Sequence, residues 1–77
     1  MPKSIFSAGQ EKLQRLLIEA RESAGLTQTA LAKKLKRPQS FVSKYESGER
    51  RLDLVELQQI CQALKISLTE FAKRFES

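Results

Sequence analysis

The segment from Thr27 to Gly48 constrains the fold of this 77-residue chain more than any other. In its first part, Leu31, Ala32 and Leu35 recur at the spacing of one helical face. Thr27 precedes that run, and its hydroxyl can accept a backbone N–H that the first turn leaves unpaired. The segment therefore predicts a short helix that begins at Thr27.

The helical pattern stops at Lys36-Arg37-Pro38. A proline pushes the residue before it out of the helical region, but it fits well at the first position of a new helix. The sequence therefore predicts a second short helix from about Pro38 to Ser47, which Gly48 can end in a left-handed conformation.

This second helix has two different sides. Phe41, Val42 and Tyr45 fall on one side at the helical period. The other side carries amides, hydroxyls and one lysine: Gln39, Ser40, Ser43, Lys44 and Ser47. Helix-turn-helix DNA recognition needs two short helices joined by a tight turn. The second of these helices needs an apolar back and a front of short polar side chains. The alternative is an ordinary amphipathic surface helix, which would usually carry more Glu and Lys and fewer Ser and Gln.

The net charge of +5 is concentrated around this segment. Residues 27–51 hold seven basic residues against two acidic ones, whereas the rest of the chain holds seven of each. Such a cluster indicates a polyanionic partner. A membrane surface is the other candidate, but an interfacial helix needs a broad apolar face beside its charges, and this segment has none to spare. We therefore expect double-stranded DNA as the partner, and no membrane.

Length and composition bound the remaining possibilities. We expect residues 1–77 to form one domain, with no separate effector-binding domain and no small-molecule effector. With no His and a single cysteine, Cys61, the chain has no usual zinc site and no disulfide framework, so we expect no metal and no cofactor. One cysteine suits a reducing cytoplasm. Without His or a paired acid–base cluster, no catalytic residue is recognisable, and we expect no enzyme.

Residues 13–71 resemble the Cro/C1-type helix-turn-helix domain of phage repressors and small bacterial regulators, the XRE family. The matching landmarks are Arg21, Gly25-Leu26-Thr27-Gln28, Leu31-Ala32, Val42-Ser43, Glu46-Ser47-Gly48 and the segment from Leu64 to Leu68. The resemblance implies an all-α fold: a compact five-helix, lambda-repressor-like DNA-binding domain with the helix-turn-helix at helices 2 and 3. It also implies a small transcriptional regulator that binds a palindromic operator as a dimer, with its third helix in the major groove.

Two residues in the turn depart from the family pattern. Family members often carry Gly at the position of Lys36 and a small apolar residue at that of Arg37. If Lys36 must take a left-handed conformation, the strain costs on the order of 1 kcal/mol.

The resemblance divides the candidate DNA-binding residues by role. Gln28 would fix a phosphate together with backbone N–H groups at the start of the second helix. Four residues of the third helix would face base edges: Gln39, Ser40, Ser43 and Lys44. Three arginines would hold the DNA backbone: Arg50, and with it Arg51 and Arg37. The alternative for the paired arginines is that they are simply solvated. Thr27 and Ser47 complete the candidate set.

In the family, the arginine at the position of Arg21 pairs with the glutamate that matches Glu46. Arg21 falls in the last turn of the first helix, where a cation suits the helix dipole. Glu46 projects beside Val42, at the border of the buried face, so the pairing is geometrically sensible. The alternative is two unrelated surface charges.

Three capping boxes mark the other helices. The first, Ser7–Gln10, opens a helix that ends near Gly25; residues 1–7 form an arm in which Ile5 and Phe6 either staple onto that helix or reach a partner chain. The second box opens a fourth helix, and the apolar spacing predicts that its inner face consists of Leu57, Ile60, Cys61 and Leu64. The two boxes after the recognition segment are Asp53–Glu56 and Ser67–Glu70.

The fifth helix carries an apolar stripe of Leu68, Phe71, Ala72 and Phe75. Phe75 lies two residues from the end of the sequence, so little remains to cover it. Leu68 corresponds to a position that family members use at their dimer contact. We therefore expect a homodimer through Leu68, Phe71 and Phe75. The alternative is that the whole stripe packs back onto the first helix.

The sequence leaves three regulatory roles open within the family: a phage-type repressor, a restriction–modification controller protein and an autoregulating antitoxin. The antitoxin role belongs to a different class, because its main partner is a toxin protein. No long disordered extension is left over to wrap such a partner.

Overall fold

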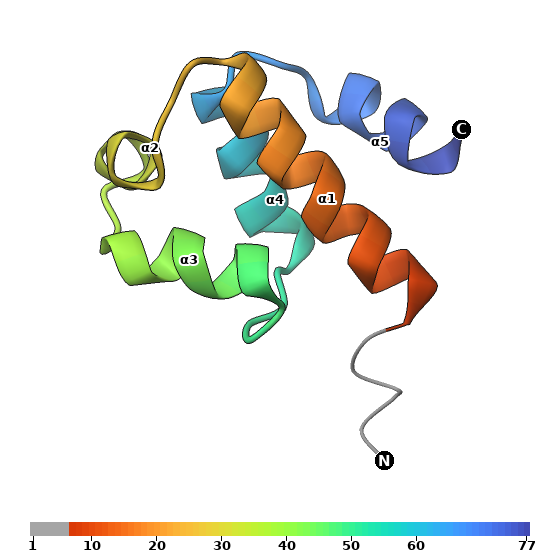
Figure 1. Cartoon of the computed structure of the whole chain (residues 1–77). Coiled ribbons are helices and arrows are strands. Elements are labelled where there is room, and N and C mark those ends of the chain that lie inside the picture. The colour runs from red at the N-terminus through yellow and green to blue at the C-terminus, as the bar shows by residue number, and fades with distance from the viewer. Residues whose placement is uncertain (1–6) are drawn as a thin grey trace.

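The computed structural model describes residues 7–77 and contains five α-helices in that range (Figure 1). They are α1 (Ala8–Ser23), α2 (Gln28–Leu35), α3 (Gln39–Ser47), α4 (Leu54–Ala63) and α5 (Leu68–Glu76). The predicted all-α, five-helix fold is therefore confirmed. The predicted arm, apart from Ser7, lies outside the described residues, as do Ile5 and Phe6.

Four of the five helices begin at a side-chain cap. The hydroxyls of Ser7, Thr27 and Ser67 each accept a backbone N–H from three residues ahead, and Asp53 does the same with its carboxylate. Only the Asp53 cap is a complete capping box, because Glu56 also accepts the N–H of Asp53. The boxes predicted at Ser7 and Ser67 are thus half formed, with the cap bond but no return bond.

Helix α3 begins one residue later than predicted. Pro38 has φ −62° and ψ 151°, so it is extended and serves as the N-cap rather than as the first helical residue. Its carbonyl oxygen accepts the N–H of Phe41 at 3.0 Å, which starts the helix. A proline ring fits this position as well as the next, because its φ suits both.

A residue in the left-handed conformation follows each of four helices, α1 to α4. Gly25 follows α1 with φ 75°, and Gly48 follows α3 with φ 89°. Lys36 does adopt the left-handed conformation between α2 and α3, with φ 58° and ψ 42°. Lys65, between α4 and α5, has φ 63°, which the sequence pattern did not indicate.

The core lies where α1, α2, α3 and α4 meet, and α5 closes it. Its most deeply buried side chains are Leu17, Leu31, Val42, Tyr45, Ile60, Cys61 and Phe71. Cys61 is a core residue, as predicted, and burial raises the pKa of its thiol. Helix α1 packs on α3 and α5, while α2 packs on α3 and α4. Consequently α3 and α5 lie on opposite sides of the molecule (Figure 1).

Candidate nucleic-acid interface

Helix α3 presents a polar face to solvent and buries its apolar face, as its sequence predicts. Phe41, Val42 and Tyr45 are between 0% and 7% exposed. Of the four predicted reading residues, Gln39, Ser40 and Lys44 are exposed and Ser43 is half-buried. Ser47, a further candidate on the same helix, is also exposed. The Ser47 hydroxyl also donates to the Lys44 carbonyl at 3.2 Å, so it is engaged at the end of the helix.

A chain of side-chain hydrogen bonds links the start of α3 to the start of α2. The Gln39 amide donates to the Gln28 amide oxygen at 2.7 Å, and the Gln28 amide in turn donates to Glu46 at 2.9 Å. Gln28 is predicted to bind a phosphate. In the structure, one N–H group of its amide already donates to Glu46 within the protein. Thr27, also in the candidate set, caps α2 by accepting the Ala30 N–H at 3.0 Å.

Arg21 and Glu46 form a two-pronged ion pair between α1 and α3. Arg21 donates from Nε to Oε2 at 2.7 Å and from Nη2 to Oε1 at 3.1 Å. Their side chains are 12% and 4% exposed. Arg21 Nη1 donates to the Leu26 carbonyl at 2.8 Å, so the guanidinium also fixes the α1–α2 loop. The hydrogen bond to Glu46 raises the pKa of Arg21.

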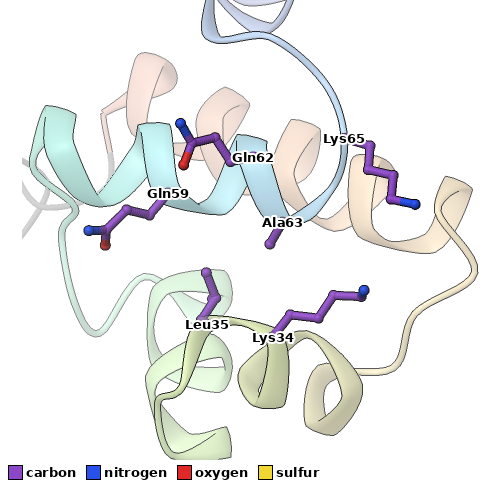
Figure 2. A pocket seen from close by; sticks show the side chains of 6 residues that line it. All are labelled: Lys34, Leu35, Gln59, Gln62, Ala63 and Lys65. Atoms are coloured by element: carbon purple, nitrogen blue, oxygen red, sulfur yellow. The ribbon is translucent and has the colours of Figure 1, made fainter.

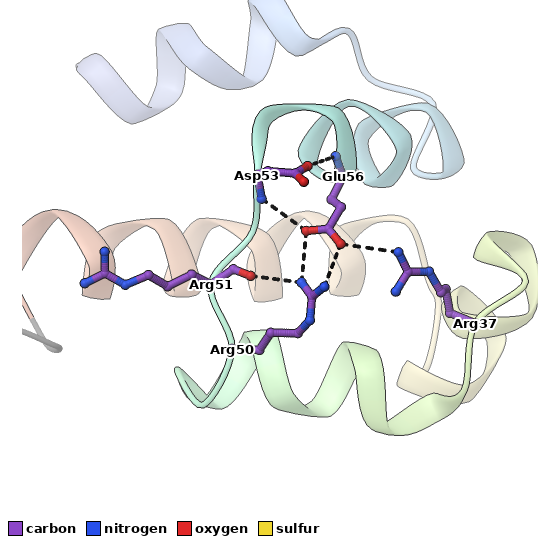
Figure 3. Close-up of polar contacts among 5 residues, drawn as sticks. All are labelled: Arg37, Arg50, Arg51, Asp53 and Glu56. Carbon is purple, nitrogen blue, oxygen red and sulfur yellow. Dashed lines mark hydrogen bonds and ion pairs between the residues drawn. The ribbon is translucent and has the colours of Figure 1, made fainter.

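Two of the candidate arginines converge on one acidic residue, Glu56 (Figure 3). Arg50 donates from Nη1 and Nη2 to the two carboxylate oxygens at 2.9 and 2.7 Å. Arg37 donates from Nη2 at 3.3 Å. The Arg50 hydrogen bonds, with that from the Asp53 N–H, lower the pKa of Glu56 to about 2. Arg51 is exposed, and its carbonyl oxygen accepts a bond from Arg50.

Sequence reasoning missed Glu56 as a member of this site. Its spacing from Asp53 marked it only as a capping-box residue, and in the structure it does cap α4. The signal that could have found it is its separation of six residues from Arg50 across a short loop. Spacing through a loop, unlike spacing along a helix, does not fix which side chains meet.

Two hollows lie outside this surface. An open cleft of about 490 Å³ between α2 and α4 is lined by Lys34, Leu35, Gln59, Gln62, Ala63 and Lys65 (Figure 2). All four of its polar side chains are exposed, so no buried polar group is placed there to orient a ligand. A second groove, of about 320 Å³, is lined entirely by apolar residues, namely Leu13, Leu54, Leu57, Leu68, Phe71, Ala72 and Phe75.

Within residues 7–77, no group of three or more His, Cys, Asp or Glu side chains is arranged to hold a metal ion. None of the described helices is long and apolar enough to cross a membrane.

Residues 17–71 match the family model described as helix-turn-helix. The chain belongs to the helix-turn-helix family. An XRE-family like protein from Pseudomonas syringae pv. tomato str. DC3000 is 44% identical to it, with a TM-score of 0.87 over 97% of this chain and 92% of that one. The match confirms the family that the sequence resembles.

This helix-turn-helix chain is also similar to the restriction–modification controller protein C.Esp1396I. The wild-type controller is 26% identical, with a TM-score of 0.83 over 91% of both chains. The controller tetramer in complex with its natural 35 base-pair operator gives the same identity and TM-score, over 91% of this chain and 92% of that one. No curated protein matches the chain.

Proposed function

We propose that this protein is a sequence-specific regulator of transcription that binds double-stranded DNA in the cytoplasm with α3 in the major groove. The observation that carries the proposal is the division of α3: an exposed amide-and-hydroxyl face on a buried apolar back, inside the segment that holds the whole net charge. A major groove admits one such helix. We propose that the protein binds DNA and catalyses no reaction. We also propose that residues 1–77 form a single domain.

The reading residues are Gln39 and Ser40 at the start of α3, followed one turn later by Ser43 and Lys44. Gln can pair with both N6 and N7 of adenine, Ser suits several bases, and Lys suits guanine or a phosphate. The bond from Gln39 to Gln28 holds the first reading side chain in place before DNA arrives. A side chain ordered in advance loses less conformational entropy on binding.

The phosphate contacts come from elements on either side of α3. Backbone N–H groups at the start of α2 would face a DNA strand in such a complex, and helix N-termini favour anions. Arg37 precedes α3 while Arg50 and Arg51 follow it, so the three arginines flank the reading helix. Such contacts fix the register of the protein on DNA without reading sequence.

We propose further that the protein acts as a homodimer through its apolar groove. Leu54, which lines this groove, is 67% exposed. Phe71 is 1% exposed and belongs to the core, so it forms the floor of the groove and not a protruding contact. Leu68 and Phe75 are half-buried at the rim. Since α5 lies away from α3, joining two copies here leaves both reading helices open (Figure 1).

The likeness to C.Esp1396I favours a controller role over an antitoxin role. A restriction or modification gene beside the gene for this protein would support that choice.

Selection of bound fragments from random double-stranded DNA tests the proposal. We expect an enriched inverted repeat, because two copies of α3 would read related half-sites about 34 Å apart. Fragments enriched without any shared sequence would contradict sequence-specific binding.

A further inference from the structure

Glu56 holds two guanidinium groups that come from opposite ends of α3 (Figure 3). Arg37 lies before the helix and Arg50 after it, and both donate to the same carboxylate. That carboxylate is itself fixed, since Oε1 accepts the Asp53 N–H at 3.1 Å in the capping box of α4. The Glu56 side chain is only 12% exposed. One acidic residue of α4 therefore sets the positions of two basic residues beside the reading helix.

Phe41 fixes the same two groups from a second direction. The guanidinium carbons of Arg37 and Arg50 lie 4.2 and 4.9 Å from the centre of its ring. Phe41 is 7% exposed and packs edge-on against Tyr45, with the ring centres 5.3 Å apart, so it cannot easily move. Guanidinium groups favour the faces of aromatic rings. An ion pair and a ring contact together fix the plane of each guanidinium as well as its place.

The hydrogen bonds of Arg50 leave one edge of its guanidinium unused. Nη1 donates to Glu56 and to the Arg51 carbonyl, and Nη2 donates once to Glu56. Of its five N–H groups, the Nε–H and the second Nη2–H have no partner among the described residues. These two lie on the same edge, where they can bind two oxygens of one phosphate. The Arg37 and Arg50 side chains are 39% and 38% exposed.

We propose that Glu56 is a positioning residue that holds Arg37 and Arg50 as a paired clamp for the DNA backbone at α3. The inference rests on the proposed DNA-binding function and adds that a half-buried acidic residue increases affinity for a polyanion. Two guanidinium groups and one carboxylate leave a net positive charge on the cluster. The carboxylate fixes the guanidiniums by their ends, and their remaining N–H groups stay available to a phosphate.

The direction in which one substitution changes the affinity for DNA distinguishes a positioning role of Glu56 from an effect of its charge alone. Glu56→Gln keeps the size of the side chain but raises the net charge of the protein by one. Charge alone would make the variant bind DNA more tightly. Loss of positioning would make it bind more weakly, because the amide cannot hold both arginines. We expect roughly tenfold weaker binding to the selected operator, the loss of about one charge-assisted contact.

The matched control is Glu49→Gln. Glu49 is an exposed acid in the loop between α3 and α4, and its carboxylate accepts a hydrogen bond from the Ser47 hydroxyl at 3.5 Å. This variant adds the same charge without touching an arginine, so we expect binding equal to or tighter than that of the wild type. Fluorescence anisotropy with labelled operator DNA gives both values, and circular dichroism checks that each variant is folded.

Two further variants separate positioning from loss of the α4 cap. Asp53→Ala removes the other half of the capping box, and we expect it to lower the melting temperature without a tenfold loss of operator binding. In an Arg50→Ala background, Glu56→Gln should cause much less than its tenfold loss. If Glu56→Gln fails to fold, Glu56→Asp retracts the carboxylate at constant charge and should also weaken binding.

Binding of Glu56→Gln as tight as that of Glu49→Gln would overturn the inference. So would an equal loss in Asp53→Ala, or an undiminished loss in the Arg50→Ala background. A wild type that binds no operator would instead overturn the proposed function, because the inference concerns only how bound DNA is held.

Discussion

Glu46 is the most constrained charged residue in the described part of the chain. It sits on α3, is 4% exposed at its side chain, and accepts hydrogen bonds from Arg21 and Gln28. Through Gln28 it is connected to Gln39, the first of the proposed reading residues. A buried carboxylate with charged and neutral donors thus connects α1, α2 and α3 at one point. We expect this junction to hold α3 in place against α1 and α2.

Arg21 and Glu46 should be strongly coupled in stability. Removing one partner leaves an uncompensated charge away from water, so we expect Arg21→Met to lower the free energy of unfolding by about 3 kcal/mol. Arg21→Met with Glu46→Met should cost less than either single change. Urea unfolding of all four proteins in a double-mutant cycle measures the coupling. Coupling of zero within a few tenths of a kcal/mol would mean that the two charges act independently.

At the scale of elements, the turn between α2 and α3 carries strain that a glycine would relieve. Lys36 occupies the left-handed region, as does Lys65 between α4 and α5. Such a conformation costs a residue with a side chain about 1 kcal/mol.

Lys36→Gly and Lys65→Gly should therefore each increase the free energy of unfolding, by up to about 1 kcal/mol. The two variants serve as controls for each other, because each removes one lysine but only Lys36 adjoins α3. Thermal melts measure the gain. A loss of stability in both variants would show that the greater freedom of glycine in the unfolded chain outweighs the strain.

The order of the helices could be predicted from sequence, because caps and apolar periodicity are local. Thr27, Asp53 and Gly48 each act where their residue types indicate. The ion pair of Arg21 and Glu46 was foreseen only through resemblance to the family.

The cluster around Glu56 could not be predicted, because it depends on three segments meeting in space. Arg37 and Arg50 look like free basic residues in sequence, and only the packing of α4 against α2 brings Glu56 between them. Similarly, the apolar period of α5 did not reveal which of its residues is covered. Phe71 is in the core because α5 turns back against α1.

On the scale of the whole molecule, the helix proposed to read DNA and the helix proposed to join two copies are separate. Helix α3 and helix α5, which contributes four of the seven residues that line the apolar groove, lie on opposite sides (Figure 1). One recognition helix reads only a few base pairs, so a second copy doubles the length of DNA that is read. Separation of the surfaces allows a dimer to form without blocking α3.

Substitution of the groove rim should prevent dimerisation and leave the fold intact. We expect the wild type to sediment as a dimer, and a Leu68→Glu, Phe75→Glu variant as a monomer, because two charges then replace apolar contacts. Arg51→Glu is the matched control on the DNA side and should remain a dimer. Circular dichroism checks folding. A wild type that is monomeric at high concentration and on operator DNA would contradict the proposed dimer.

Base reading by α3 is the central feature of the proposed function, and Gln39→Ala tests it most directly. Affinity should be measured for the selected operator and for random DNA of equal length and salt, for the wild type, Gln39→Ala, Ser40→Ala and Arg50→Ala. We predict that each of the first two changes costs roughly 1–3 kcal/mol on the operator and little on random DNA. Arg50→Ala should weaken both and reduce the salt slope by about one. Equal losses on operator and random DNA for Gln39→Ala would contradict the assignment of α3 as the reading helix.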